Sequence, residues 1–263
     1  MHWVPVIAQN WADMTQVQDS GEKARLGDPI FRTCLLQLLL GGCLWMAFTG
    51  TVAAAENATV HGTVRVLHHV GNDFGSGDVV VWLTPLTQGA PVAPGPTARL
   101  MQKNKKFIPH VVAVTQGTEI EFPNQDLFFH NVFSIHQGKT VDLGLYESGA
   151  ARKVRFSQPG VSYIFCNIHP QMSAAVIVLK TKYFAVSDAE GSFQITHLAP
   201  GRYRLSVWYE LAPETELTTQ TKEIEVAAGD NEISPIELHS TDAPPERPNK
   251  EGEPYYSSSP KTR

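Results

Sequence analysis

Cysteine is scarce in this sequence: the chain contains three, Cys34, Cys43 and Cys166. The first two lie in one apolar segment near the N-terminus, so removal of that segment would leave Cys166 alone. A disulfide framework within one mature chain is then excluded. A single thiol in an oxidising compartment is either buried in the core or used chemically, and its neighbours must decide between the two.

Long apolar runs are equally rare, and residues 34–49, CLLQLLLGGCLWMAFT, form the only one. This run is short for a membrane span. Basic residues precede it and Ala53-Ala54-Ala55 follows it as a cleavage site of the A-x-A type. Residues 1–55 are therefore interpreted as an N-terminal extension with a secretory signal peptide. A retained membrane anchor and a lipid-modified Cys43 are the alternatives.

A large excess of charge of either sign is also missing. Lys and Arg number 21 against 26 Asp and Glu, which gives a net charge of −5. A nucleic-acid partner would require a basic face, so none is expected. The hydrophobic fraction of 42% with 18% charged residues indicates a globular body with a core. The mature protein is expected to be periplasmic or otherwise exported, without a stable membrane span.

No segment between residues 56 and 240 shows a helical period of 3.6 residues over three turns. Short alternating or apolar runs separated by turn residues take its place, at residues 59–67, 78–83, 111–114, 119–122, 153–156, 161–165, 174–179 and 203–207. Strands at this spacing predict an all-β fold of the sandwich or barrel type. The proline-rich segment 240–263 has few aliphatic residues and predicts a disordered tail.

The segment 163–172, YIFCNIHPQM, carries the most specific chemical signal. It places a thiolate, Cys166, an imidazole, His169, and a thioether, Met172, at the spacing C-x2-H-x2-M. A blue-copper site uses two histidines and one cysteine in a trigonal plane with a weak axial methionine. His130, in the upstream segment FFHNVF, would supply the second imidazole.

The neighbours of these four residues favour a ligand role. Each residue alone is more often structural, but the joint pattern predicts one copper ion held by His130, Cys166, His169 and Met172. We expect the nearby aromatic side chains to exclude water and tune the reduction potential: Phe128, Phe129, Phe133, Tyr163 and Phe165. Outside the ligand set, Asn131 is expected to tie the two ligand segments together. Pro170 lacks an N–H and cannot donate a hydrogen bond to the sulfur.

The remaining histidines are not expected to join this site. They have no sulfur ligand nearby in the sequence: His61, His68, His69, His110, His136, His197 and His239. The pair His68-His69 could bind a metal weakly, but we interpret it as the solvated end of a loop.

Residues 99–180 resemble a cupredoxin. The resemblance rests on KKFIPHVVAVTQGTEIEFPNQDLFFHNVFS, similar to the opening strands and first-ligand motif, and on PGVSYIFCNIHPQMSAAVIVL, similar to the ligand loop and last strand. The short loop is similar to that of the amicyanins and shorter than that of the plastocyanins. The resemblance implies a Greek-key β-sandwich, the four copper ligands named above, and one-electron transfer with a redox protein partner.

The same resemblance argues against catalysis. Copper nitrite reductases and multicopper oxidases place a histidine beside the ligand cysteine, whereas Phe165 and Asn167 flank Cys166 here. The chain also lacks a His-x-His pair, so a second, catalytic copper centre has no obvious ligands. We therefore expect an electron carrier and not an enzyme. A copper module for storage, delivery or sensing, and a structural or interaction β-protein with a copper site, remain the alternatives.

Residues 186–210, VSDAEGSFQITHLAPGRYRLSVWYE, resemble a carboxypeptidase regulatory-like or Cna-B-like domain, which implies a transthyretin-like β-sandwich. The opening strands of such a domain are missing after residue 180, but residues 62–66 and 78–83 resemble them. The cupredoxin is therefore predicted to be inserted in this second sandwich. The expected limits are 56–88 for its first strands, 89–98 for a linker, 99–180 for the copper domain, 181–239 for its remainder and 240–263 for the tail.

Overall fold

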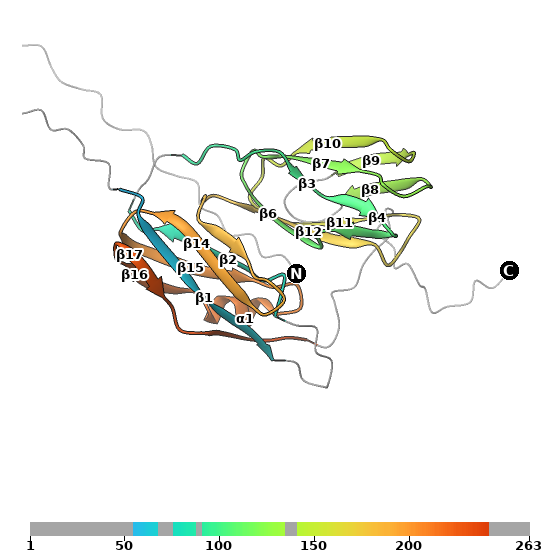
Figure 1. Ribbon diagram of the computed structural model, residues 1–263. Helices are drawn as coiled ribbons and strands as arrows, with labels where there is room; N and C mark the ends of the chain where they lie inside the picture. The colour runs from blue at the N-terminus through green and yellow to red at the C-terminus, as the bar shows by residue number, and fades with distance from the viewer. Residues whose placement is uncertain (1–54, 68–75, 88–90, 135–140, 242–263) are drawn as a thin grey trace, which may run out of the picture. The chain divides into compact units, whose positions relative to one another are not determined.

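The structure is a computed structural model, and it describes residues 55–67, 76–87, 91–134 and 141–241. These residues form strands and a single short helix, which confirms the all-β fold class (Figure 1). The first strands are β1 Ala58–Leu67, β2 Val80–Pro85, β3 Ala98–Arg99, β4 Met101–Lys103, β5 Lys106–Ile108, β6 Val111–Thr115, β7 Glu119–Pro123, β8 His130–Ser134 and β9 Val141–Tyr146. The later elements are β10 Ala151–Arg155, β11 Gly160–Phe165, β12 Ser173–Leu179, β13 Phe184–Val186, β14 Ser192–Leu198, β15 Gly201–Trp208, α1 Glu214–Thr219, β16 Lys222–Val226, β17 Gly229–Glu232 and β18 Ile236–His239.

Strands β3–β12 form a sandwich, here called the ligand sandwich. One sheet has the order β10-β7-β3, the other the order β6-β12-β11-β8-β9, and β4 pairs with β5 as a hairpin. Alternation in β7 shows why the sheets pack: Ile120 and Phe122 are fully buried, while Glu121 faces outward and pairs with Arg99. The buried side chains of both sheets form one hydrophobic core.

Strand β12 differs from β7 because every one of its residues is buried. Its side chains alternate between two cores. Ala174, Val176 and Val178 face the inside of the ligand sandwich. Ala175 and Ile177 belong to a separate cluster that includes side chains from β2 and β15. An uninterrupted apolar strand of this kind is expected where both faces of a sheet are covered.

Strands β1, β2 and β13–β18 form a second sandwich, here called the flanking sandwich. One sheet has the order β14-β1-β17 with β18 also paired to β1, and the other has the order β13-β2-β15-β16. Val64 and Val81 share one core with Phe193 and Leu205. This core is therefore formed by residues that precede the ligand sandwich in the sequence together with residues that follow it.

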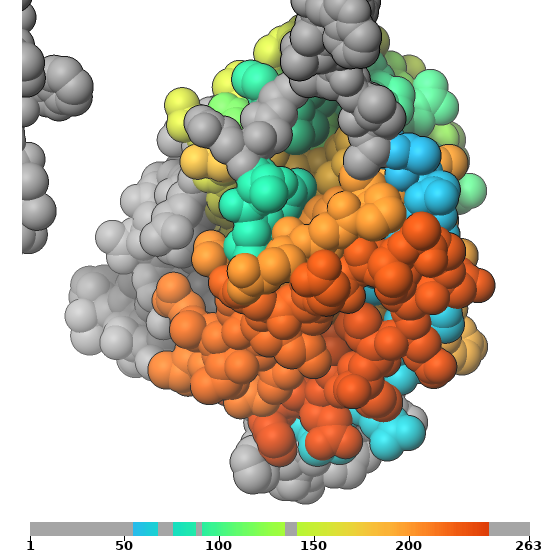
Figure 2. Space-filling model, turned by 90° about the vertical axis from the view of Figure 1, so that its left-hand side faces the viewer, coloured from blue at the N-terminus to red at the C-terminus, as the bar shows by residue number. Residues whose placement is uncertain are grey.

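This strand pairing is the arrangement that insertion of the ligand sandwich requires. Strand β1 is antiparallel to β14, and β2 lies between β13 and β15. Figure 2 shows the same mixing, with the blue atoms of the first strand beside the orange and red atoms of the last ones. The residue limits of the domains remain a prediction.

Hydrogen bonds anchor the described residues of the two connections between the sandwiches. The N–H of Gly95 donates to the hydroxyls of Thr115 and Thr118, and Ala98 already belongs to β3. The end of the expected linker 89–98 therefore packs as part of the ligand sandwich. On the return connection, the Thr181 hydroxyl donates to the carbonyl of Leu83 at 2.7 Å.

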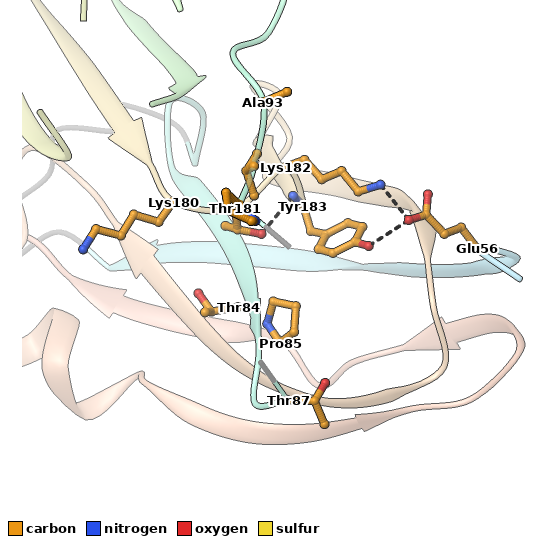
Figure 3. A pocket seen from close by; sticks show the side chains of 11 residues that line it. Glu56, Thr84, Pro85, Thr87, Ala93, Lys180, Thr181, Lys182 and Tyr183 are labelled. Atoms are coloured by element: carbon orange, nitrogen blue, oxygen red, sulfur yellow. Dashed lines mark hydrogen bonds and ion pairs between the residues drawn. The ribbon is translucent and has the colours of Figure 1, made fainter. Parts of the chain in front are cut away.

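A cavity of ≈ 600 Å³ lies beside this return connection. Figure 3 shows Lys182 and Tyr183 pointing to the same carboxylate, that of Glu56. The Lys182 ammonium lies 2.6 Å from it and the Tyr183 hydroxyl donates to it at 3.2 Å. These contacts fasten the start of the described chain to the segment that follows the ligand sandwich.

The sandwiches also meet away from the connections, within one compact unit, Val52–Arg263. His110, which precedes β6, contacts the Glu210 carboxylate at 2.5 Å through Nε2. Its Nδ1 lies 3.1 Å from the carbonyl oxygen of Ser173, the first residue of β12. The Glu210 hydrogen bond raises the pKa of His110, although burial acts in the opposite direction.

One glycine is required by its surroundings. Gly191 ends the turn that begins at Asp188 and has a φ of 83°. A Cβ atom at this position would lie 2.2 Å from the carbonyl oxygen of Val64 in β1. The turn at residues 188–191 therefore packs directly against β1, a strand from the other end of the domain.

Several expectations lie outside the described residues. They concern the signal peptide and its alternatives at residues 1–54, His68-His69, His136, and the tail beyond residue 241. Among the described residues, no helix is long and apolar enough to cross a membrane.

Candidate metal centre

Three neighbouring strands position the expected ligands. His130 begins β8, Cys166 directly follows β11, and Met172 directly precedes β12. Strands β11 and β12 form a hairpin in which Phe165 is opposite Ser173, and Phe165 also pairs with Phe133 of β8. The hairpin loop and the start of β8 therefore meet at one end of the ligand sandwich.

The loop between β11 and β12 is held closed by its own backbone. The N–H of Met172 donates to the carbonyl of His169 at 2.9 Å, and the N–H of Cys166 donates to the carbonyl of Met172 at 3.3 Å. These bonds hold Cys166, His169 and Met172 in one tight turn.

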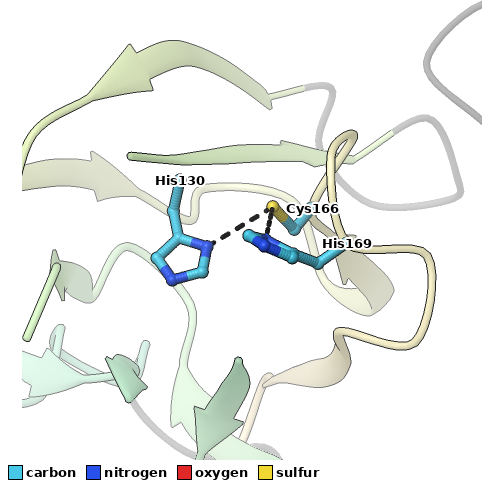
Figure 4. Close-up of side chains that lie close together, drawn as sticks. All are labelled: His130, Cys166 and His169. Carbon is cyan, nitrogen blue, oxygen red and sulfur yellow. Dashed lines mark hydrogen bonds between the residues drawn. The ribbon is translucent and has the colours of Figure 1, made fainter. Parts of the chain in front are cut away.

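The structure brings the two histidines and the cysteine together (Figure 4). The Sγ atom of Cys166 lies 3.6 Å from Nδ1 of His130 and 3.6 Å from Nδ1 of His169. All three donor atoms lie within 4.8 Å of one another. In the described part of the chain, no other group of three His, Cys or acidic side chains comes as close.

Burial differs between the candidate ligands in a way that matters for function. His130 and Cys166 are completely buried and Met172 is almost so, packed in the same core as Cys166. His169 is half-buried. The centre is therefore enclosed on the protein side and reaches solvent at the His169 ring.

These donors suit copper. A thiolate sulfur matches the soft Cu(I) ion, and imidazole nitrogen binds both Cu(I) and Cu(II). A metal-ligating imidazole must be neutral at the ligating nitrogen. Burial is the main cause that lowers the pKa of His169, and the nearby Lys105 ammonium acts in the same direction, so the neutral form is favoured.

His130 is oriented by a carboxylate that the sequence reasoning did not identify. Its Nε2 donates to Oδ2 of Asp126 at 2.8 Å, which leaves Nδ1 as the lone-pair nitrogen that faces Cys166. A ligand histidine bonded to a carboxylate in this way is held in one tautomer and becomes a stronger donor. The only sequence signal was an acidic residue four positions before the ligand, between the polar pair Asn124-Gln125 and the apolar residues 127–129.

Asp126 also supports the β4–β5 turn. Its Oδ1 accepts the N–H of Asn104 at 2.6 Å, and its Oδ2 accepts the N–H of Lys105 at 2.9 Å. Burial alone would raise the pKa of Asp126, but these bonds and the one from His130 together lower it. One ionised side chain thus joins the hairpin turn to the ligand His130.

The aromatic side chains fall into two groups. Phe133 and Phe165 are buried with ring centroids 5.6 Å apart, and Phe128 lies 5.1 Å from His130 and 5.5 Å from His169 between centroids. Phe128 therefore lies against both ligand histidines, as expected. Phe133 and Phe165 are buried, but neither belongs to the core cluster that contains Cys166 and Met172. Phe129 is 56% exposed and therefore does not shield the centre.

Asn131 bonds differently from the expectation. Its Nδ2 donates to Oδ1 of Asp142 at 3.3 Å, which ties β8 to β9 and not to the ligand loop. The reason is the strand pairing, because Asn131 lies opposite Leu145 of β9. Its Oδ1 is buried without a hydrogen-bond partner in the described residues. Pro170 is half-buried within the ligand loop.

The other described histidines lie apart from this cluster. His110 contacts Glu210 and His239 contacts Glu216. Neither His61 of β1 nor His197 of β14 belongs to a three-residue metal-binding group in the described part of the chain.

Comparison with protein families gives one match. Residues 168–232 match the model of polysaccharide lyase family 4, domain II. This segment runs from the ligand loop to the end of β17 and makes up less than half of the chain. It overlaps the region that resembles a carboxypeptidase regulatory-like domain and gives it a different family description. A search of curated proteins finds no significant match.

Solved copper proteins are among the structural matches. A copper-containing nitrite reductase from Thermus scotoductus is 24% identical over 37% of this chain, with a TM-score of 0.31, and the match spans 26% of its own length. A purple cupredoxin from Nitrosopumilus maritimus is 22% identical, with 31% of this chain and 99% of its own covered and a TM-score of 0.29. A reduced amicyanin variant is 18% identical, with 33% and 92% covered and a TM-score of 0.30. With TM-scores this low, none of these matches establishes the fold or the function of this chain.

Proposed function

We propose that this chain is an exported type 1 (blue) copper protein that carries single electrons between redox partners. Its ligands are His130, Cys166, His169 and Met172. The observation that carries the proposal is the position of two imidazole Nδ1 atoms, each 3.6 Å from one buried thiol sulfur. Nitrogen, nitrogen and sulfur in this arrangement form the trigonal set of a blue-copper site, to which Met172 would add the weak axial ligand.

Copper, when bound, supplies a one-electron Cu(II)/Cu(I) couple. The protein contributes a donor set that needs little rearrangement between the two oxidation states. Backbone bonds close the ligand loop, and the Asp126 carboxylate holds His130 in one orientation. Rigid ligands keep the reorganisation small, and exclusion of water by the surrounding rings tunes the potential.

Electrons would enter and leave at His169, the ligand side chain that is half-buried instead of enclosed. Exposed apolar side chains lie next to the ligands in the sequence: Leu127, Phe128, Phe129 and Ile168. An apolar surface around an exposed ligand edge allows a partner to approach without stripping water from charged groups. We assign electron transfer rather than catalysis because Phe165 and Asn167, not histidines, flank the ligand Cys166.

The family assignment is part of this proposal. Residues 99–180 would form a cupredoxin domain, inserted in a transthyretin-like sandwich of the carboxypeptidase regulatory-like type. Export would follow from the signal peptide, with cleavage after Ala55 and a periplasmic or extracellular mature protein. Intact mass of the secreted chain tests this, and a mature form with a lipid on Cys43 would contradict it.

The visible spectrum of the copper-loaded mature protein tests the main proposal. We expect an intense colour from charge transfer between the Cys166 sulfur and Cu(II), lost in Cys166→Ser and in His130→Gln. His110→Gln is the matched control, because His110 lies near β12 without belonging to the cluster. A colourless complex with ordinary tetragonal copper signals would contradict the proposal.

A further inference from the structure

The turn between β4 and β5 carries an unusual concentration of positive charge. Lys103, Lys105 and Lys106 are three of four consecutive residues, and all three are exposed. The chain as a whole has a net charge of −5, so this turn is a local exception. No carboxylate among the described residues forms a salt bridge with any of the three.

The turn brings like charges close together. Lys103 and Lys106 are directly opposite in the hairpin, and like charges at such positions repel. Asn104 and Lys105 both have a φ of 55°, a conformation that a lysine adopts rarely. The two bonds from their N–H groups to Asp126 hold the turn in this form.

The turn lies beside the proposed copper ligands. Asp126 binds both the turn and His130, as described above. The Nζ atom of Lys105 lies 5.6 Å from the ring centroid of Phe128, whose ring lies next to that of His169. The charge of Lys105 therefore lies near the surface at which His169 reaches solvent, and Lys103 and Lys106 belong to the same turn.

Apolar side chains complete this surface. Leu127 is 94% exposed, Phe129 56% and Ile168 47%. Leu127 and Phe129 precede the ligand His130, and Ile168 precedes the ligand His169. Large exposed apolar side chains near charged groups are typical of interaction sites.

We infer that the lysine turn and these apolar residues form the docking surface for an acidic redox protein, whose carboxylates pair with Lys103, Lys105 and Lys106. The inference rests on the proposed copper site, since electron exchange gives the surface its purpose. Charge complementarity selects this occupant. A second copy of the chain would meet this face with the same positive turn. A membrane would cover His169 without offering a redox centre.

Two small oxidants of opposite charge test the electrostatics of this surface. The Cu(I) protein is mixed with hexacyanoferrate(III), or with tris(phenanthroline)cobalt(III), and the appearance of the Cu(II) colour is timed at several ionic strengths. Each oxidant accepts one electron as Cu(I) becomes Cu(II). The variant replaces Lys103, Lys105 and Lys106 by Gln, and a second variant replaces them by Arg.

A matched control removes the same number of charges elsewhere, with Lys153, Lys180 and Lys222 replaced by Gln. We expect the Gln variant of the turn to react about tenfold more slowly with the anionic oxidant and to lose its salt dependence, because local charge steers association. The Arg variant and the control should react as the wild type does. Poly-L-glutamate should slow the wild-type reaction with hexacyanoferrate(III) and leave the Gln variant unaffected.

The outcomes separate the two proposals. A protein without the blue colour refutes the copper site itself. A normal colour with equal rates for the turn variant and the control refutes the docking surface alone. Lysine-dependent sedimentation with phosphatidylserine vesicles, or a lysine-dependent dimer in solution, would overturn the acidic-protein partner in favour of those occupants.

Discussion

Replacement of Asp126 by Asn is the sharpest test of how this centre is built. The carboxylate is 7% exposed, and its Oδ2 accepts bonds from both His130 and the N–H of Lys105. An amide keeps one acceptor oxygen but places an NH₂ group where one of the carboxylate oxygens was. In either orientation of the amide, its NH₂ group faces an N–H group that the carboxylate accepted, either that of Asn104 or those of Lys105 and His130. The negative charge is also lost.

The structure sets the size of the effect. Hydrogen bonds to a charged group contribute about 1.5–3 kcal/mol each, and leaving a buried partner unsatisfied costs about 1–3 kcal/mol. The turn N–H groups lie at the surface and can bond water, whereas His130 is completely buried. We therefore expect Asp126→Asn to lower the free energy of unfolding of the metal-free protein by about 2–4 kcal/mol.

The copper form supplies a second measurement. Loss of the carboxylate makes His130 a weaker donor and removes a negative charge near the metal, and both changes favour Cu(I). The reduction potential should therefore rise. Urea unfolding and redox titration measure the two effects, with Glu121→Gln as control, since its partly exposed pair with Arg99 contributes about 0–1 kcal/mol. A stability loss below that of the control, with an unchanged potential, would refute this role of Asp126.

Met172→Leu should keep the blue colour and raise the reduction potential, because a weak axial ligand tunes the couple without supplying the charge-transfer band; loss of colour would contradict this. Glu210→Gln should flatten the pH dependence of stability in urea. The Glu210 carboxylate raises the pKa of His110, while burial opposes this shift and Asp78 supports it. The contribution of this pair to folding stability is therefore complete below the ordinary pKa of 6.5 and disappears as pH rises through the raised pKa. An equal fall of the unfolding midpoint between pH 6 and 9 in wild type and variant would show that this pair does not titrate. Leu205→Ala should destabilise the flanking sandwich by about 2–5 kcal/mol, because Leu205 is fully buried in its core, and an unchanged midpoint would contradict the shared core.

The sequence by itself determined those features that depend on local pattern. Alternation placed strands close to β7, β11 and β15, since a two-residue period reports directly which side chains face a core. The six residues of α1 left no mark, because they span fewer than two turns and bury no side chain. The short hairpin of β4 and β5 and the strand β9 were missed because their apolar positions are too few to form a pattern.

The candidate ligands could be read from the sequence because three of them share one loop, and because His130 stands in a second motif of recognisable type. The structure alone decided how they are supported. Asp126 and the turn at Asn104 are 22 residues apart, and no local period connects them. The bond of Asn131 to Asp142 likewise follows from strand pairing, which the spacing of residues does not encode.

The arrangement of the two sandwiches required the tertiary structure most. The sequence indicated an apolar strand at residues 174–179, but only the structure shows that both of its faces are buried and that Val80 and Trp208 of the flanking sandwich belong to the cluster on its second face. Strand β1 pairs with β14 across more than 120 residues. Periodicity reports that a face is buried, whereas the partner that buries it depends on contacts between distant parts of the chain.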